Sequence, residues 1–172
     1  MEGVGESSCY GHCTRRIMGG VRKLRVYADT SVFGGCFDPE FEMESRKFFD
    51  DVRQGRFTVV ISDVTVEELQ PAPEEVRQVL ATLPAEHVEL VEVSGEAEAL
   101  REAYLEAAIV GIASSNDAAP IAAATVAEVD IVVSWNFKHI VHFEKIAGYE
   151  GVNMLRGFRS PRIYSPKEVV EP

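Results

Sequence analysis

The sequence has few cysteines and no long apolar run. Cys9, Cys13 and Cys36 are the three thiols in 172 residues, and this odd, small number argues against the disulfide framework of a secreted domain. No apolar run approaches the roughly 20 residues that a membrane-spanning helix needs. Residues 1–20 also lack the continuous apolar stretch of a signal peptide. We therefore expect a soluble protein of the cytoplasm.

The segment Cys9-Tyr-Gly-His-Cys13 contains only half of the ligands of a structural zinc site, because no second Cys/His cluster follows. Periodic sequence begins only near Val21. We predict that residues 1–20 are a disordered N-terminal extension, with Met18 as an alternative biological start. On this interpretation the two cysteines have no function.

Basic residues are also scarce. The chain has 17 Lys and Arg against 28 Asp and Glu, a formal net charge of -11. An acidic protein is a poor non-specific binder of nucleic acid. Acids gathered in a metal site nevertheless attract cations that bridge to phosphates, and an acidic surface suits a basic protein partner. The charge balance therefore does not exclude a nuclease.

The remaining composition is that of one globular domain, which we place at residues 21–172. Hydrophobic residues make up 46% of the chain and charged residues 26%, close to ordinary values. Apolar runs alternate with segments of helical periodicity. Strands are expected at 24–28, 57–61, 88–93, 131–134 and 162–164, and helices at 38–53, 63–70, 74–83, 96–111 and 121–129. This alternation predicts an α/β fold with a mainly parallel sheet between two helical layers.

Four side chains of this layout can meet at one edge of the sheet. Asp29 follows the first strand, Glu68 lies on the helix after the second, Asp117 opens a later helix, and Asn136 follows the strand after that helix. Parallel strands place their carboxyl ends on the same side, where α/β sheets bind ligands. Taken singly, each acid also fits a helix cap or a solvated helix position.

Carboxylates that converge in one cleft need a cation. Two unit charges about 4 Å apart repel by roughly 4 kcal/mol at an effective dielectric near 20. Oxygen ligands without His or Cys favour Mg²⁺ or Mn²⁺ over zinc. The chemistry expected of such a site is metal-assisted hydrolysis of a phosphodiester.

Five segments, in this order, resemble the PIN domain family. They include Ala28-Asp29-Thr-Ser, the Glu67-Glu68-Leu string, and Asp117-Ala-Ala-Pro120. A Ser-Trp-Asn-Phe-Lys-His string at 134–139 and a closing Ser-Pro-Lys-Glu-Val at 165–169 complete the set. The closest likeness is to the subgroup with that Ser-Trp-Asn-Phe-Lys-His string, often the toxins of bacterial toxin-antitoxin pairs. The resemblance spans residues 24–170.

The resemblance implies a three-layer α/β/α sandwich and a Mg²⁺- or Mn²⁺-dependent ribonuclease. The family's three acids match Asp29, Glu68 and Asp117, which are then the catalytic metal ligands, and Glu67 is a surface neighbour. Asn136 completes the catalytic set through a water. RNA is the implied substrate, a small antitoxin the implied protein partner, and a homodimer the implied assembly.

Two positions depart from the family pattern. Asn136 stands where many PIN domains have a fourth Asp, and an amide offers an oxygen without a charge, so one metal is expected rather than two. Pro120 stands where relatives in the subgroup often have His. An alternative interpretation is a catalytically weakened PIN-fold module that binds RNA or a protein.

The candidate substrate contacts lie near these acids. Thr30 and Ser134 can orient metal-bound waters or contact substrate, and Lys138 and His139 follow Asn136 on the same side. A second group comprises His142 and the arginines Arg156, Arg159 and Arg162. The alternative for all of these cations is pairing with surface acids. Trp135 is expected in the core, with stacking on a base as the alternative.

A haloacid dehalogenase-type phosphatase also begins with an Asp at the end of its first strand. That chemistry needs a second acid two residues after Asp29, where this chain has Ser31. It also needs a late acidic pair that the sequence does not provide. The phosphatase is therefore the less favoured enzymatic alternative.

Overall fold

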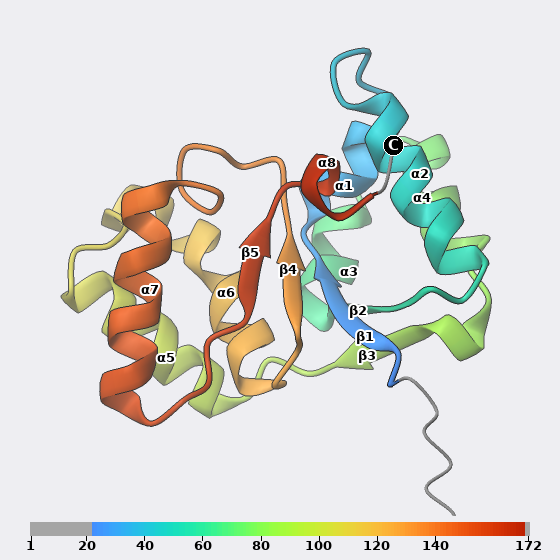
Figure 1. Ribbon diagram of the computed structural model, residues 1–172. Coiled ribbons are helices and arrows are strands. Elements are labelled where there is room, and N and C mark those ends of the chain that lie inside the picture. The colour runs from blue at the N-terminus through green and yellow to red at the C-terminus, as the bar shows by residue number, and fades with distance from the viewer. Residues whose placement is uncertain (1–21, 171–172) are drawn as a thin grey trace, which may run out of the picture.

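Five strands form one parallel sheet in the computed structural model, which describes residues 22–170 (Figure 1). The strand order is β3-β2-β1-β4-β5, and every neighbouring pair is parallel. The strands are β1 (Leu24–Ala28), β2 (Phe57–Ser62), β3 (Val88–Val91), β4 (Ile131–Val133) and β5 (Arg162–Tyr164). Each was predicted from its apolar run.

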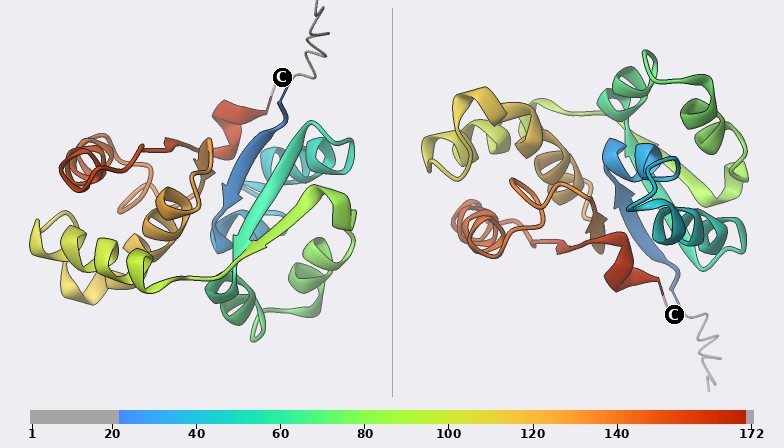
Figure 2. Two further views of the ribbon diagram at one scale, coloured as in Figure 1. Left: turned by 90° about the horizontal axis from the view of Figure 1, so that it is seen from below. Right: turned by 90° about the horizontal axis from the view of Figure 1, so that it is seen from above.

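The helices cover both faces of this sheet. They are α1 (Thr30–Gly35), α2 (Glu42–Arg53), α3 (Asp63–Leu69), α4 (Glu74–Ala81), α5 (Gly95–Glu106), α6 (Ser115–Val126), α7 (Phe143–Arg156) and α8 (Pro166–Val169). Figure 2 shows α5, α6 and α7 together on one side of the sheet, with α1 to α4 on the other. The predicted three-layer α/β/α sandwich with a parallel sheet is confirmed.

The alternation of side chains along β1 explains the two cores. Val26 and Ala28 face the α1–α4 layer, where they pack in a cluster with Phe33 and Phe48. Tyr27, between them, faces the α5–α7 layer. This period of two is that of a strand buried on both faces. Complete burial of such apolar side chains contributes about 1.5–3 kcal/mol each to the stability of the fold. This packing on both faces fixes the position of β1 and of the residues that follow it.

Several helix boundaries differ from the prediction. The helix expected from residue 38 begins at Glu42, because the side chain of Asp38 accepts the N–H of Glu40 and forms a turn. The helix expected to reach residue 111 ends at Glu106, and Ala108 has a φ of 54°. The helix expected from residue 121 starts earlier, at Ser115.

Helix α7 was not predicted from the sequence. It runs for 14 residues from the N-cap His142 to a left-handed Gly157. Only Tyr149 and Asn153 of this helix are fully buried, so its apolar stripe is narrow. Tyr104 of α5 donates a hydrogen bond of 2.5 Å to Asn153 and ties the two helices together.

Residues 1–20, with Cys9, Cys13 and the alternative start, lie outside the described residues. Cys36 is buried and free, and its burial raises the pKa of its thiol to about 11. No helix within residues 22–170 has both the length and the apolar character to cross a bilayer.

Candidate functional site

The candidate site lies where the sheet changes its winding direction. From the central β1 the chain builds β2 and β3 on one side and β4 and β5 on the other. Ala28 pairs with Val133, so β1 and β4 end side by side. Ligands of open α/β sheets bind at such a switch point, beyond the carboxyl ends of the strands. Asp29 and Asn136 follow these two strand ends.

An open cleft of about 330 Å³ occupies this position. Its lining includes Asp29, Glu68, Asp117 and Asn136, together with Thr30, Ser31, Asn116 and Pro120. The structure therefore brings together the three acids and the amide that the sequence separates by more than 100 residues. No His or Cys belongs to this lining.

Asp29 is held by two hydroxyl groups. Its Oδ2 accepts hydrogen bonds from Ser31 at 2.6 Å and from Ser134 at 2.8 Å. Each hydroxyl in turn accepts a backbone N–H from the segment after β4, that of Trp135 on Ser31 and that of Asn136 on Ser134, both at 3.0 Å. Asp29 is only 7% exposed. The two serines therefore fix its carboxylate between the ends of β1 and β4.

Glu68 approaches the cleft from α3. Its Oε2 accepts a hydrogen bond of 3.1 Å from Thr30. Partial burial raises the pKa of Glu68, the bond from Thr30 opposes this rise, and the charges of Asp29 and Asp117 add to it. The charges of Asp29 and Asp117 therefore both disfavour the ionised form of Glu68.

The start of α3 is fixed by a buried hydroxyl cluster. Ser62 and Thr65 form a capping box at the N-terminus of this helix. The hydroxyl of Tyr27 lies 2.8 Å from that of Ser62 and 3.0 Å from that of Thr65. These contacts join α3 to β1. The helix that bears Glu68 is therefore fixed relative to the strand that Asp29 follows.

Asp117 lies in the first turn of α6 and is held by the loop after β4. Its Oδ1 accepts a hydrogen bond of 2.8 Å from the amide nitrogen of Asn136. The carbonyl oxygen of Asn136 accepts the backbone N–H of His139 at 2.9 Å. The ring Nε2 of His139 lies 3.9 Å from Asp117 Oδ2 and 3.4 Å from the hydroxyl of Ser114. The amide nitrogen of Asn136 thus restrains Asp117, while its amide oxygen is bound to the backbone of the same loop.

The donor set fits a hard divalent cation, since the acids in the cleft offer only oxygen and their mutual repulsion calls for positive charge. Within residues 22–170, however, no three Asp, Glu, His or Cys side chains already lie close enough to share one ion. Glu68 is exposed and has the longest side chain of the three acids, so it has the most freedom to move toward the other two.

The predicted substrate contacts have different surroundings. Ser134 is 0% exposed and donates to Asp29 Oδ2, which places it to orient that carboxylate; its contact with substrate stays a prediction. Thr30 lines the cleft but donates to Glu68. Lys138 is exposed and forms no hydrogen bond or ion pair within the described residues. His139 is partly buried beside Asp117, and its contact with substrate stays a prediction.

The predicted arginine cluster does not face the cleft. Arg159 binds Asp130 and the backbone before β4, at the opposite edge of the sheet. Arg162 begins β5 at that same edge, and Arg156 pairs with Glu106 of α5. These side chains pair with acids or solvent, as the alternative interpretation held. Trp135 is buried, and its indole donates to Ser45 at 2.8 Å, as expected of a core residue.

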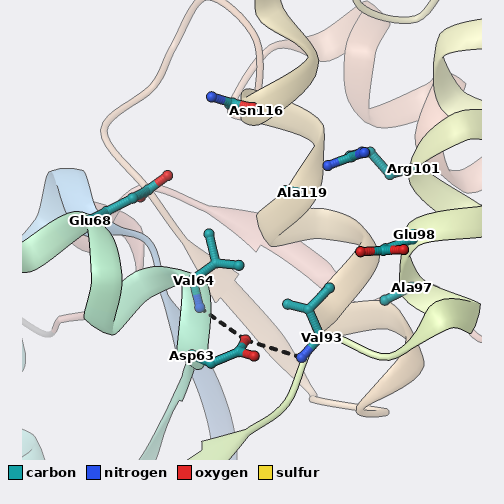
Figure 3. Close-up of a pocket in the computed structure, with 9 residues that line it drawn as sticks. All are labelled: Asp63, Val64, Glu68, Val93, Ala97, Glu98, Arg101, Asn116 and Ala119. Carbon is teal, nitrogen blue, oxygen red and sulfur yellow. Dashed lines mark hydrogen bonds between the residues drawn. The ribbon is translucent and has the colours of Figure 1, made fainter.

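Sequence reasoning missed three residues near the cleft. Ser31 was considered only because a phosphatase of the haloacid dehalogenase type would have an acid at that position. Its spacing of two from Asp29 is nevertheless that of a local side-chain turn. Asn116 lines the cleft directly before Asp117. Arg101 of α5 lines a second cavity that adjoins the cleft (Figure 3). Nothing in the sequence distinguished it from a surface helical residue.

Comparisons with known proteins support the fold. The structure of VapBC2 from Rickettsia felis bound to a DNA fragment from their promoter matches with a TM-score of 0.51 and 13% identity, covering 83% of this chain and 98% of that chain. The structure of DNA-bound VapBC from Salmonella typhimurium matches with a TM-score of 0.50 and 16% identity, with the same coverage. A scan of protein-family models and a search of curated proteins found no match. At these identities the likeness concerns the fold alone.

Proposed function

We propose that this protein is a metal-dependent endoribonuclease that acts in the cytoplasm. The observation that carries the proposal is the meeting of Asp29, Glu68 and Asp117 in one cleft at the switch point of the sheet. The pKa of Glu68 is raised, chiefly by partial burial, and the charges of Asp29 and Asp117 add to the rise. Such a cleft favours a cation and, through it, a phosphodiester.

Asp29, Glu68 and Asp117 are the residues that would hold Mg²⁺ or Mn²⁺. When bound, such an ion supplies an activated water and neutralises charge that develops on the phosphate. Asp29 offers its Oδ1, to which no hydrogen bond is made within residues 22–170, while Ser31 and Ser134 hold its Oδ2. This division leaves one oxygen of a cleft-lining carboxylate without a hydrogen bond within the described residues.

Asn136 contributes orientation rather than charge. Its amide nitrogen holds Asp117 and its carbonyl oxygen holds the backbone of His139. An Asp at this position would be repelled by Asp117 where the amide is bound to it. The site therefore carries three negative charges in place of four, which suits a single divalent ion.

A pair of neighbouring glutamates tests the proposal. Glu68 lines the cleft, whereas Glu67 is exposed and lines neither the cleft nor the adjoining cavity. Wild-type protein should cleave labelled single-stranded RNA with Mn²⁺ or Mg²⁺ and stop in excess chelator. Glu68→Gln should lose about 10²-fold or more of this activity, on the scale of removing one electrostatic group from an active site. Glu67→Gln should keep it.

The proposal would be abandoned if Glu68→Gln and Glu67→Gln cleaved equally fast in matched preparations. Cleavage that survives the chelator would likewise mean a contaminating nuclease or chemistry without a metal. A thermal unfolding measurement on both variants establishes that each is folded.

The solved structures that share this fold are complexes named VapBC, bound to DNA. By analogy, together with the resemblance to PIN-type toxins, we propose that this chain is the toxin of a toxin-antitoxin pair. A net charge of -11 suits a basic antitoxin segment over the acidic cleft. Co-expression with the product of a short adjacent gene should yield a complex that suppresses the nuclease. Homodimerisation stays a prediction.

A second candidate is a binding module without catalysis. One observation in its favour is the hydrogen bond from Asn136 that already uses an oxygen of Asp117. The other is the spacing of the acids, since no group of three within residues 22–170 is close enough to hold a metal ion. RNA binding without any Mn²⁺ binding at millimolar metal would favour the module. A phosphatase of the haloacid dehalogenase type is disfavoured, because Ser31 uses its hydroxyl to hold Asp29. Trapping of a phosphoryl-enzyme would reverse that judgement.

A further inference from the structure

A second cavity of about 220 Å³ opens beside the acidic cleft, between α3, α5 and α6 (Figure 3). Glu68 and Asn116 line both spaces. A ligand that has one group in the cleft can therefore place the next group in this second cavity, which we call the side pocket.

The side pocket has apolar walls and a charged edge. Val64, Val93 and Ala97 line it from three different segments. Glu98 and Arg101 reach it from α5, and their spacing of three places them on one face of that helix. Figure 3 shows both side chains directed from α5 toward the space in front of α6. The pocket thus presents a carboxylate acceptor and a guanidinium with several donors next to apolar side chains.

Arg101 is the one cation among the residues that line the two spaces. Its Nε is buried and has no hydrogen-bond partner within the described residues. Its ion pair is with the adjacent Glu102, at 3.3 Å, whose side chain is 59% exposed. An ion pair so exposed is weak. Nη1 has no hydrogen-bond partner within the described residues and Nη2 has only this weak one, so the guanidinium keeps two nitrogens to offer to a ligand.

The charges of the pocket disfavour a phosphate as that ligand. Asp63, Glu68 and Glu98 line it against the single Arg101, so a second anion would meet net repulsion. A nucleobase carries no charge, has apolar faces for the valine and alanine walls, and offers donors and acceptors on its edges. Single-stranded RNA is read in this manner, with unstacked bases bound along their edges.

We propose that the side pocket is a base-binding subsite that accepts an unpaired guanine next to the phosphate in the acidic cleft. Guanine presents the O6 and N7 acceptors that match the fork of Arg101, and its N1–H and N2–H₂ donors match the carboxylate of Glu98. Adenine has a donor where guanine has O6, and pyrimidines lack N7. This inference rests on the proposed ribonuclease function and adds sequence selectivity to it.

The test uses short labelled RNAs that differ only in the nucleotide on either side of a mapped cleavage point. Wild-type protein should prefer guanine at one of these positions by about five- to 150-fold, the range of one bidentate base contact. Replacement by 7-deazaguanine, which lacks N7, should remove part of this preference. Arg101→Gln and Glu98→Gln should abolish it, and Arg77→Gln, an exposed charge change on α4 outside both spaces, should leave it intact.

Arg101→Lys separates a base contact from a phosphate contact. A lysine keeps the charge but loses the planar fork, so the guanine preference should fall in this variant as well. If Arg101→Gln instead weakened cleavage equally for all bases while Arg101→Lys restored it, the side pocket would bind a phosphate and the inference would be wrong. Equal cleavage of all four sequences by wild type would also overturn it, with the nuclease function intact.

Failure of the nuclease proposal gives a different result, namely no cleavage of any sequence by wild type. In that case the same RNAs are compared by fluorescence anisotropy. Tighter binding of the guanine-containing RNA, lost in Arg101→Gln and Glu98→Gln, would support the pocket without catalysis. Absence of that difference would overturn it.

Discussion

Replacement of Ser134 by alanine tests how the site is built. The hydroxyl donates to Asp29 Oδ2 at 2.8 Å and accepts the N–H of Asn136 at 3.0 Å, in a position with 0% exposure. Loss of a hydrogen bond to a charged group costs about 1.5–3 kcal/mol, and loss of the neutral one about 0.5–1.5 kcal/mol. The free energy of unfolding should therefore fall by about 2–4.5 kcal/mol.

For a chain of this size, that loss corresponds to a decrease in Tm of about 4–18 °C. Metal affinity should fall about 10- to 100-fold, since Asp29 loses one of the two groups that orient it. Urea unfolding measures the first effect, and the Mn²⁺ concentration for half-maximal RNA cleavage measures the second. Ser115→Ala, at a half-buried serine without a side-chain hydrogen bond within residues 22–170, is the control and should change stability by no more than about 0.5 kcal/mol. Equal stability and equal metal dependence in the two variants would refute the support role of Ser134.

Three further substitutions probe the same edge of the sheet. The raised pKa of Glu68 means that the folded protein binds its proton more tightly than the unfolded chain does, so without metal the stability falls as pH rises from about 4 through the raised pKa. Glu68→Gln removes this pH-dependent loss, so the gain in Tm of the variant over wild type should grow across that range. A gain in Tm that does not change with pH would contradict this. Asn136→Asp replaces a donor to Asp117 by a like charge, and should cost about 2–4 kcal/mol without metal and recover it with Mn²⁺; no response to Mn²⁺ would count against the metal site. Gly35→Ala would put a Cβ 2.5 Å from the hydroxyl of Ser45 and should cost about 1–3 kcal/mol in urea unfolding, whereas an unchanged midpoint would disprove the close contact.

The positions of Asp29 and Asn136 were predictable because Asp29 directly follows one apolar strand run and Asn136 lies three residues after the end of another. The two side chains then meet only if β1 and β4 are neighbours in the sheet. The structure has this arrangement, because Ala28 pairs with Val133. The choice of Glu68 over Glu67 came from the resemblance to PIN domains, since one residue along a helix changes the face by about 100° and periodicity alone left both open.

The support of these side chains could not be predicted, because it depends on contacts between distant segments. Ser31 and Trp135 are separated by 104 residues and meet only when β1 and β4 pair. Helix α7 was missed for a related reason, since its burial depends on a few polar and aromatic contacts such as that of Asn153 rather than on a broad apolar stripe. Arg101 acquires significance only from the cavity that α3, α5 and α6 enclose together.

The most direct test of a metal-dependent nuclease is to measure bound Mn²⁺ per chain and RNA cleavage on the same preparation. Electron paramagnetic resonance provides the first quantity over a range of Mn²⁺ concentrations. We expect about one ion per chain, with a cleavage rate that rises in parallel, and loss of both in Asp29→Asn. Absence of bound Mn²⁺ at millimolar concentration, or cleavage that is unchanged in Asp29→Asn, would contradict the account.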